Sequence, residues 1–242
     1  MGFLEYSDIS FRAYGVSGKQ QEIVQRKHSI LKSCYEYYAM EPKSILFVGF
    51  NPAILQCTAD KIYVAEVSPE VESWLHSNGI PFELVQIEDL FNYGKTFDAV
   101  IAVEEYFTFF NEEAKQKTQF EMICKTVKKI MITTLRDYKN QEFKDREFSM
   151  PAVIRNDAGS TIFLEYHEYD ATDRNAWSRI VYEINDNQLR VNSRFNCRQM
   201  FFKQCAKFGY DSGATEFLVH KNLMYKSLIK KNYEHVISIK FG

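Results

Sequence analysis

Acidic side chains stand at the ends of three short apolar segments in this sequence. A carboxylate can accept hydrogen bonds from two neighbouring hydroxyl groups or from an amine, and it can act as a general base. Gly49 ends a fourth apolar segment, and a residue without a side chain lets the backbone approach a bulky ligand. The acids are Glu66 after 61–65, Glu88 and Asp89 after 82–87, and Glu104 after 97–103. They mark a candidate ligand-binding site.

The apolar segments are expected to be the strands that position these side chains. Each segment is continuous rather than alternating, which is typical of parallel strands with both faces buried. Helical stretches separate several of them, so the pattern predicts βαβ units and a parallel sheet, whose ligands bind at the carboxyl ends of the strands. The expected strands are 44–49, 61–66, 82–87, 97–103 and 129–134, and the expected helices are 19–40, one starting at Pro52, 69–78 and 111–127.

The second half of the chain no longer shows apolar strands that alternate with helices. Residues 137–149 are highly charged and are expected to form a loop, while the turn signal at 185–188 predicts a β-hairpin near 178–195. Further strands are expected at 161–169, 214–220 and 235–241, with a helix at 197–208. We therefore expect a single domain over 1–242, with an N-terminal helix at 19–40, a ligand-binding core at 44–138, an inserted β segment at 139–196 near the site, and a closing part at 197–242.

Composition fits one globular domain and disfavours several classes of protein. The chain has 242 residues, of which 45% are hydrophobic and 26% charged, and its net charge is −2. No apolar run reaches the ~18 residues of a membrane span. The start lacks the regions of a signal peptide, and the five cysteines are scattered without a CxxC pair. We therefore expect a cytoplasmic protein with no metal site and no membrane contact.

Basic residues gather near the end of the chain. We name four of them the basic C-terminal patch: Lys221, Lys226, Lys230 and Lys231. A patch of this kind can bind a polyanion, and it can equally be an ordinary solvated face. The sequence leaves both interpretations open.

The order and spacing of the motifs resemble those of the class I, Rossmann-like, S-adenosylmethionine-dependent methyltransferases. Four segments carry the resemblance: a strand with a glycine turn at 45–53, a strand ending in an acid at 62–69, an acid pair at 84–89, and a strand opening Phe-Asp at 97–105. The resemblance implies an α/β fold with a Rossmann-like, doubly wound, mainly parallel seven-stranded sheet and an antiparallel last strand. The predicted β-hairpin would be an addition to that fold.

The resemblance also implies a cofactor and a set of site residues. S-adenosylmethionine is the implied cofactor, with Glu66 on its ribose and Glu88 or Asp89 on its adenine amine. Glu104 is the implied catalytic residue, facing the methyl group, and Tyr106 and His167 are implied to contact the substrate. The full set of implied cofactor-binding residues is Gly49, Phe50, Asn51, Glu66, Val67, Glu88, Asp89 and Val103. The sequence does not identify the methyl acceptor.

Three positions of the first motif depart from the family's pattern. Asn51 and Ala53 replace glycines, and Phe47 stands where the family often has an acid. A non-catalytic binding or assembly protein on the same fold is therefore the alternative to a methyltransferase. A dinucleotide-dependent oxidoreductase is disfavoured, because the G-x-G-x-x-G fingerprint would need glycines at 51 and 54, where Asn51 and Ile54 stand.

Overall fold

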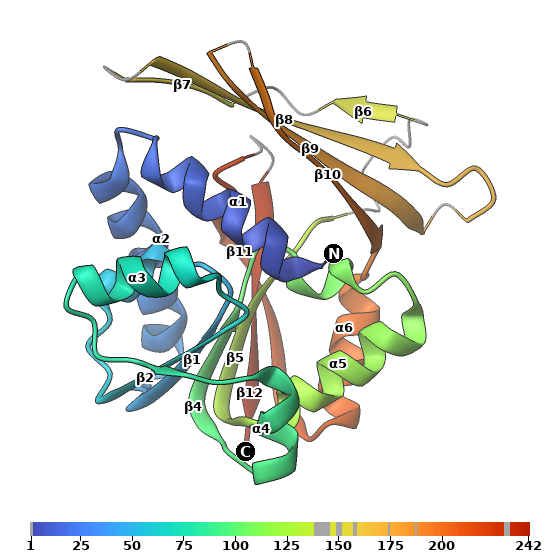
Figure 1. The fold of residues 1–242 in the computed structure, drawn as a ribbon. Helices are drawn as coiled ribbons and strands as arrows, with labels where there is room; N and C mark the ends of the chain where they lie inside the picture. The colour runs from blue at the N-terminus through green and yellow to red at the C-terminus, as the bar shows by residue number, and fades with distance from the viewer. Residues whose placement is uncertain are drawn as a thin grey trace.

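Two β-sheets, with the N-terminal helix between them, make up the protein (Figure 1). The computed structural model describes residues 2–137, 146–148, 152–156, 159–173, 175–186, 188–229 and 233–242. The predicted loop at 137–149 lies largely outside the described residues. Within the described residues, no helix has the length and apolar character needed to cross a membrane.

The larger sheet has seven strands in the order β11-β12-β5-β4-β1-β2-β3. Strands β1 to β5 pair in parallel, and β12, the last strand, runs antiparallel to both of its neighbours. The strands are β1 (Ser44–Val48), β2 (Lys61–Ala65), β3 (Glu83–Leu84), β4 (Phe97–Ala102), β5 (Val127–Leu135), β11 (Ala214–Lys226) and β12 (Tyr233–Phe241). This topology confirms the predicted seven-stranded, mainly parallel sheet.

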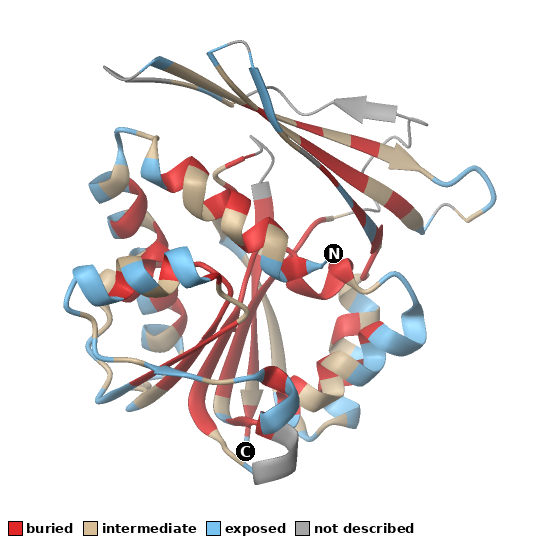
Figure 2. Cartoon of the chain, in the orientation of Figure 1, coloured by how far each residue is buried: buried red, intermediate tan, exposed pale blue. Residues whose placement is uncertain are grey.

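Helices cover both faces of this sheet, which is why its central strands are continuously apolar (Figure 2). All six residues of β4 are buried. Helices α2 and α3 share one hydrophobic core with the sheet, and α4, α5 and α6 share the other. The helices are α1 (Phe3–Gly15), α2 (Gln20–Tyr37), α3 (Pro69–Ser77), α4 (Ile87–Tyr93), α5 (Glu113–Lys125) and α6 (Phe202–Asp211), with 3-10 turns η1 (Pro52–Gln56) and η2 (Tyr106–Phe109).

The second sheet is antiparallel and larger than the predicted hairpin. Its strands are β6 (Arg146–Phe148), β7 (Ala152–Asn156), β8 (Gly159–Tyr169), β9 (Ala176–Asn185) and β10 (Gln188–Arg198). The hairpin itself is confirmed as β9 and β10, and β8 pairs with the other side of β9. Buried residues of β8 to β10 belong to the same core as α1, so this sheet covers the carboxyl edge of the larger one (Figure 1).

The structure corrects four sequence predictions. The helix expected from Pro52 is only the single 3-10 turn η1, and the third strand is shortened to two residues. Glu88 and Asp89 consequently lie in the first turn of α4 and not at the end of a strand. Helix α6 begins five residues later than expected, at Phe202 and not at 197. Helix α1 was not predicted at all, because serines interrupt its apolar stripe at two of the positions that are buried.

Candidate functional site

The turn after β1 has the shape of a ligand-binding loop. Gly49 has a φ of +79°, a left-handed conformation that residues with side chains rarely adopt. The Asn51 side chain accepts a hydrogen bond of 3.1 Å from the Ala53 amide and so caps η1, while Pro52 occupies the first position of that turn. The Asn51 Nδ2 atom is buried and, within the described residues, has no hydrogen-bond partner. An orphaned donor therefore stands beside the glycine turn.

Glu66 directly follows β2 at the same edge, with its backbone also left-handed at a φ of +55°. Burial, and then the charge of Glu88, raise the pKa of its carboxyl above the usual value. Among the described residues, no hydrogen bond or ion pair to this half-buried carboxylate is present. Burial, and then the charge of Glu66, also raise the pKa of Tyr106. The structure thus leaves a desolvated acceptor at this edge.

Glu104 follows β4 and is almost fully buried. One carboxylate oxygen accepts from Lys27 Nζ at 2.9 Å, and the other accepts from Ser10 Oγ at 2.8 Å. The Tyr225 hydroxyl donates to the first oxygen at 3.4 Å. Its φ is +60°. The predicted catalytic carboxylate is therefore held by a buried cation from α2 and a serine from α1.

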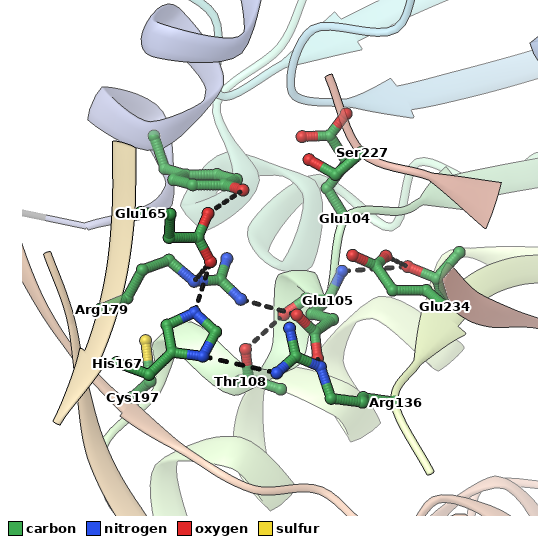
Figure 3. Close-up of polar contacts among 12 residues, drawn as sticks. Glu104, Glu105, Thr108, Arg136, Glu165, His167, Arg179, Cys197, Ser227 and Glu234 are labelled. Atoms are coloured by element: carbon green, nitrogen blue, oxygen red, sulfur yellow. Dashed lines mark hydrogen bonds and ion pairs between the residues drawn. The ribbon is translucent and has the colours of Figure 1, made fainter. Parts of the chain in front are cut away.

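Next to Glu104, Glu105 enters a buried network of charges that the sequence did not reveal (Figure 3). Its carboxylate pairs with Arg179 Nη2 at 2.6 Å and with Arg136 Nε at 3.6 Å. Arg179 Nε lies 3.2 Å from Glu165, which also contacts His167. The network joins the carboxyl edge of the larger sheet to β8 and β9 of the second sheet.

Aromatic rings surround the Arg179 guanidinium at the centre of this network. The guanidinium carbon lies 4.7 Å from the Tyr6 ring centre, 5.0 Å from that of Phe109 and 4.9 Å from that of Trp177. Burial lowers the pKa of Arg179, but the charges of Glu165 and other neighbours outweigh it, so the pKa is raised overall. The site keeps a permanent cation between its two sheets.

The structure gathers most of the predicted site residues at one edge and leaves others away from it. The residues at the carboxyl ends of β1, β2 and β4, or directly after them, are Gly49, Phe50, Asn51, Glu66, Val67, Val103, Glu104 and Tyr106. Glu88 and Asp89 are exposed on α4, and His167 belongs to the charge network on β8. Of the basic C-terminal patch, Lys221 and Lys226 lie on β11, whereas Lys230 and Lys231 lie outside the described residues.

The alternation of β8 is the signal that could have found part of the network. Residues 163, 165 and 167 are buried and their neighbours are not fully so, which places Glu165 and His167 on the face that packs inward. A buried carboxylate on such a face needs a cationic partner. The partner, Arg179, is 14 residues further along the chain on the neighbouring strand, a pairing that the sequence alone does not specify.

No family model matches the sequence, and a search of curated proteins found no match. The structure is similar to a solved S-adenosylmethionine-dependent methyltransferase from Clostridium acetobutylicum, with a TM-score of 0.67, 11% sequence identity, and coverage of 90% of this chain and 92% of the other. The fold is that of the class I methyltransferases.

Two further solved structures have the same fold. A sugar N-methyltransferase from Streptoalloteichus has a TM-score of 0.67 and 9% identity, over 97% of this chain and 92% of the other. An amino pentose methyltransferase from Micromonospora echinaspora, solved with S-adenosylmethionine bound, has a TM-score of 0.61 and 9% identity, over 97% and 96% of the two chains. The similarity therefore spans both sheets, and at these identities it concerns the fold.

Proposed function

We propose that the protein binds S-adenosylmethionine at the carboxyl edge of its larger sheet and transfers the methyl group to an acceptor. The observation that carries the proposal is the pair of unmet polar groups at that edge, the Glu66 carboxylate and the Asn51 amide. A buried polar group without a partner is costly, and it calls for a ligand that satisfies it. S-adenosylmethionine offers a ribose diol to the carboxylate and a carboxylate to the amide.

The geometry of the edge matches the chemistry of such a ligand. Glu66 can accept both ribose hydroxyls, and the left-handed turn at Gly49 provides an approach without a side chain. Val67 and Val103 flank the strand ends as apolar walls. Asp89 and Glu88, exposed in the first turn of α4, remain the candidates for the adenine amine. The residues present therefore fit the cofactor chemically.

Methyl transfer is a displacement in which positioning and electrostatics supply most of the rate acceleration. When bound, the cofactor supplies the electrophilic methyl group. Glu104 remains the candidate to face that methyl group, and its pairing with Lys27 holds the carboxylate in one orientation. Arg179, Glu165 and His167, on the second sheet, are the candidates to orient an acceptor. The sugar and amino pentose methyltransferases that share the fold make a polar small molecule the first acceptor class to test.

Calorimetric titration with S-adenosylmethionine and S-adenosylhomocysteine tests the proposal directly. We expect both to bind with one-to-one stoichiometry. The Asn51→Ala and Glu66→Ala variants should each bind more weakly, because each removes one of the two unmet groups. Failure of both the wild-type protein and a folded chain without α1 to bind either compound at millimolar concentration would refute the methyltransferase proposal.

One observation favours the second candidate, a non-catalytic binding or assembly protein. The Phe3 ring lies directly against the Gly49 turn, so a side chain of the protein itself occupies the approach to the loop. A protein that no longer uses its cofactor site could fill it in this way. Absence of cofactor binding in every variant with a displaced α1 would favour this candidate.

A further inference from the structure

Helix α1 lies across the carboxyl edge of the larger sheet, between that edge and the second sheet (Figure 1). Its buried face touches the glycine turn. A Cβ atom added to Gly49 would stand 2.4 Å from a ring carbon of Phe3 and 3.2 Å from Ser7 Oγ. The Phe3 ring also packs edge-on against Tyr106, with 4.7 Å between ring centres. Phe3 thus fills the space between the turn after β1 and the residues after β4.

Polar contacts fix α1 in this position. Ser7 Oγ accepts a hydrogen bond of 2.6 Å from the Phe50 amide, a donor of the glycine turn itself. Asp8 accepts a bond of 2.7 Å from Ser68, the residue that caps α3 directly after Glu66 and Val67. Ser10 binds Glu104. The helix therefore occupies groups on three of the loops that the proposed cofactor site uses.

The glycine turn is packed on both sides. Phe3 of α1 lies against Gly49 on one side. On the side of α3, the cavity lined by Gly49, Phe50, Asn51, Val71 and Trp74 has a volume of about 10 Å³, whereas sites for small molecules and cofactors commonly have ~300–1,000 Å³. A cofactor can therefore reach the turn only from the side that Phe3 covers.

The same helix covers the second sheet's half of the site. The Tyr6 hydroxyl donates to Glu165 at 3.4 Å, and the Tyr6 ring lies over Arg179. Further along α1, Arg12 pairs with Glu183 of β9 at 2.8 Å. Side chains of one helix therefore contact both the proposed cofactor region and the candidate acceptor region.

We propose that α1 is an autoinhibitory helix, which must leave the carboxyl edge before the cofactor binds and which closes the acceptor region until then. This inference rests on the proposed function, since it concerns the same site. When only a fraction of the molecules is in the state that can bind a ligand, the apparent affinity falls in proportion to that fraction. Release of α1 by an acceptor, a partner or a sequence change would accordingly strengthen cofactor binding without altering any residue that touches the cofactor.

The test compares cofactor affinity in variants of α1. The double variant Ser7→Ala/Asp8→Ala removes two of the polar contacts of α1. With α1 closed, the Phe50 amide then has lost its acceptor, whereas with α1 open the amide can bind water. We expect this double variant to bind S-adenosylhomocysteine at least about tenfold more tightly than wild type in calorimetry, because a buried unpaired donor penalises the closed state alone. Leu4→Ala is the matched control, because Leu4 is 43% exposed on the same helix. Its affinity should equal that of wild type.

Hydrogen exchange gives a second readout that is independent of affinity. If the cofactor binds only when α1 has left, saturating S-adenosylhomocysteine should speed amide exchange in α1 of the wild-type protein. A ligand that packed beneath a closed helix would instead slow that exchange. Stopped-flow binding should level off at high ligand concentration in wild type and stay linear in the double variant.

The outcomes separate the two proposals. Equal affinity in wild type and the Ser7→Ala/Asp8→Ala variant, or slower exchange in α1 with ligand, overturns the autoinhibitory helix and leaves the proposed function standing. A third outcome overturns both proposals. In it, none of three proteins binds the cofactor: wild type, the double variant, and a chain that lacks residues 2–15 and retains its circular dichroism.

Discussion

Replacing Glu66 by alanine is the most direct perturbation of the proposed cofactor site. The carboxylate is desolvated and has no partner among the described residues, so two ribose hydroxyls would supply its only direct hydrogen bonds. Hydrogen bonds to a charged group contribute a net ~1.5–3 kcal/mol. At ~1.4 kcal/mol per tenfold change in affinity, Glu66→Ala should weaken binding of S-adenosylmethionine by roughly ten- to a hundredfold. Glu66→Gln should weaken it less, because the amide keeps one acceptor.

Calorimetry on the three proteins measures this effect, with Glu70→Ala as the control. Glu70 is an exposed acid in the first turn of α3, so its removal changes the charge equally and should leave affinity unchanged. Stability provides a second check. Because burial raises the pKa of Glu66, the ionised carboxylate opposes folding above that pKa, and Glu66→Ala should unfold no more easily than wild type at pH 7. Unchanged affinity in a folded Glu66→Ala protein would refute the assignment.

Two substitutions, a pH titration and a salt titration give further predictions. Lys27→Met leaves the Glu104 carboxylate buried without its cation, and denaturant unfolding should show a loss of about 3–5 kcal/mol that Glu104→Gln in the same chain largely restores. Gly49→Ala should destabilise the fold by more than ~1 kcal/mol, since its φ is +79° and the new Cβ overlaps the Phe3 ring; Phe3→Ala should recover part of that loss. Cofactor affinity should fall as pH drops through the raised pKa of Glu66, above the usual 4.5, and a flat profile over that range would contradict the role. If the basic C-terminal patch binds a polyanion, binding of single-stranded DNA should weaken steeply with salt, and salt-insensitive binding or none would show an ordinary solvated face.

The sequence specified the larger sheet well because its signal is local. Strands buried on both faces have continuous apolar runs, and four of the five predicted parallel strands are present nearly as expected. The third, predicted over 82–87, failed because the structure makes Gln86 the N-cap of α4 and Ile87 its first residue, which leaves only Glu83–Leu84 as a strand. The helix expected from Pro52 failed for another reason. Proline and the Asn51 cap start a turn correctly, but they do not determine how long it continues.

The site was predictable only where one segment carries the signal. The positions of Gly49, Glu66 and Glu104 at the carboxyl edge could be predicted because each comes directly after an apolar segment, and their roles there stay predictions. The network of Glu105, Arg179 and Arg136 was not predictable, because Glu105 follows β4, Arg136 follows β5 and Arg179 lies on β9, and the three meet only through tertiary packing. Helix α1 was missed since its contacts with the site run through serine hydroxyls, and a buried serine resembles a surface serine in sequence.

Three glutamates at the carboxyl edge share a left-handed backbone: Glu66, Glu104 and Glu105, with φ values of +55°, +60° and +57°. For a residue with a side chain this conformation costs roughly 1–2 kcal/mol, so the edge holds about 3–6 kcal/mol of strain. Domains of ordinary stability unfold at a cost of ~5–15 kcal/mol, so this strain is a large share of what the rest of the fold supplies. Glycine at position 66 would relax the backbone and raise thermal stability while deleting the proposed ribose contact. Higher thermal stability and loss of ligand binding are therefore coupled at this edge. A selection for thermostable variants should enrich glycine at position 66 first.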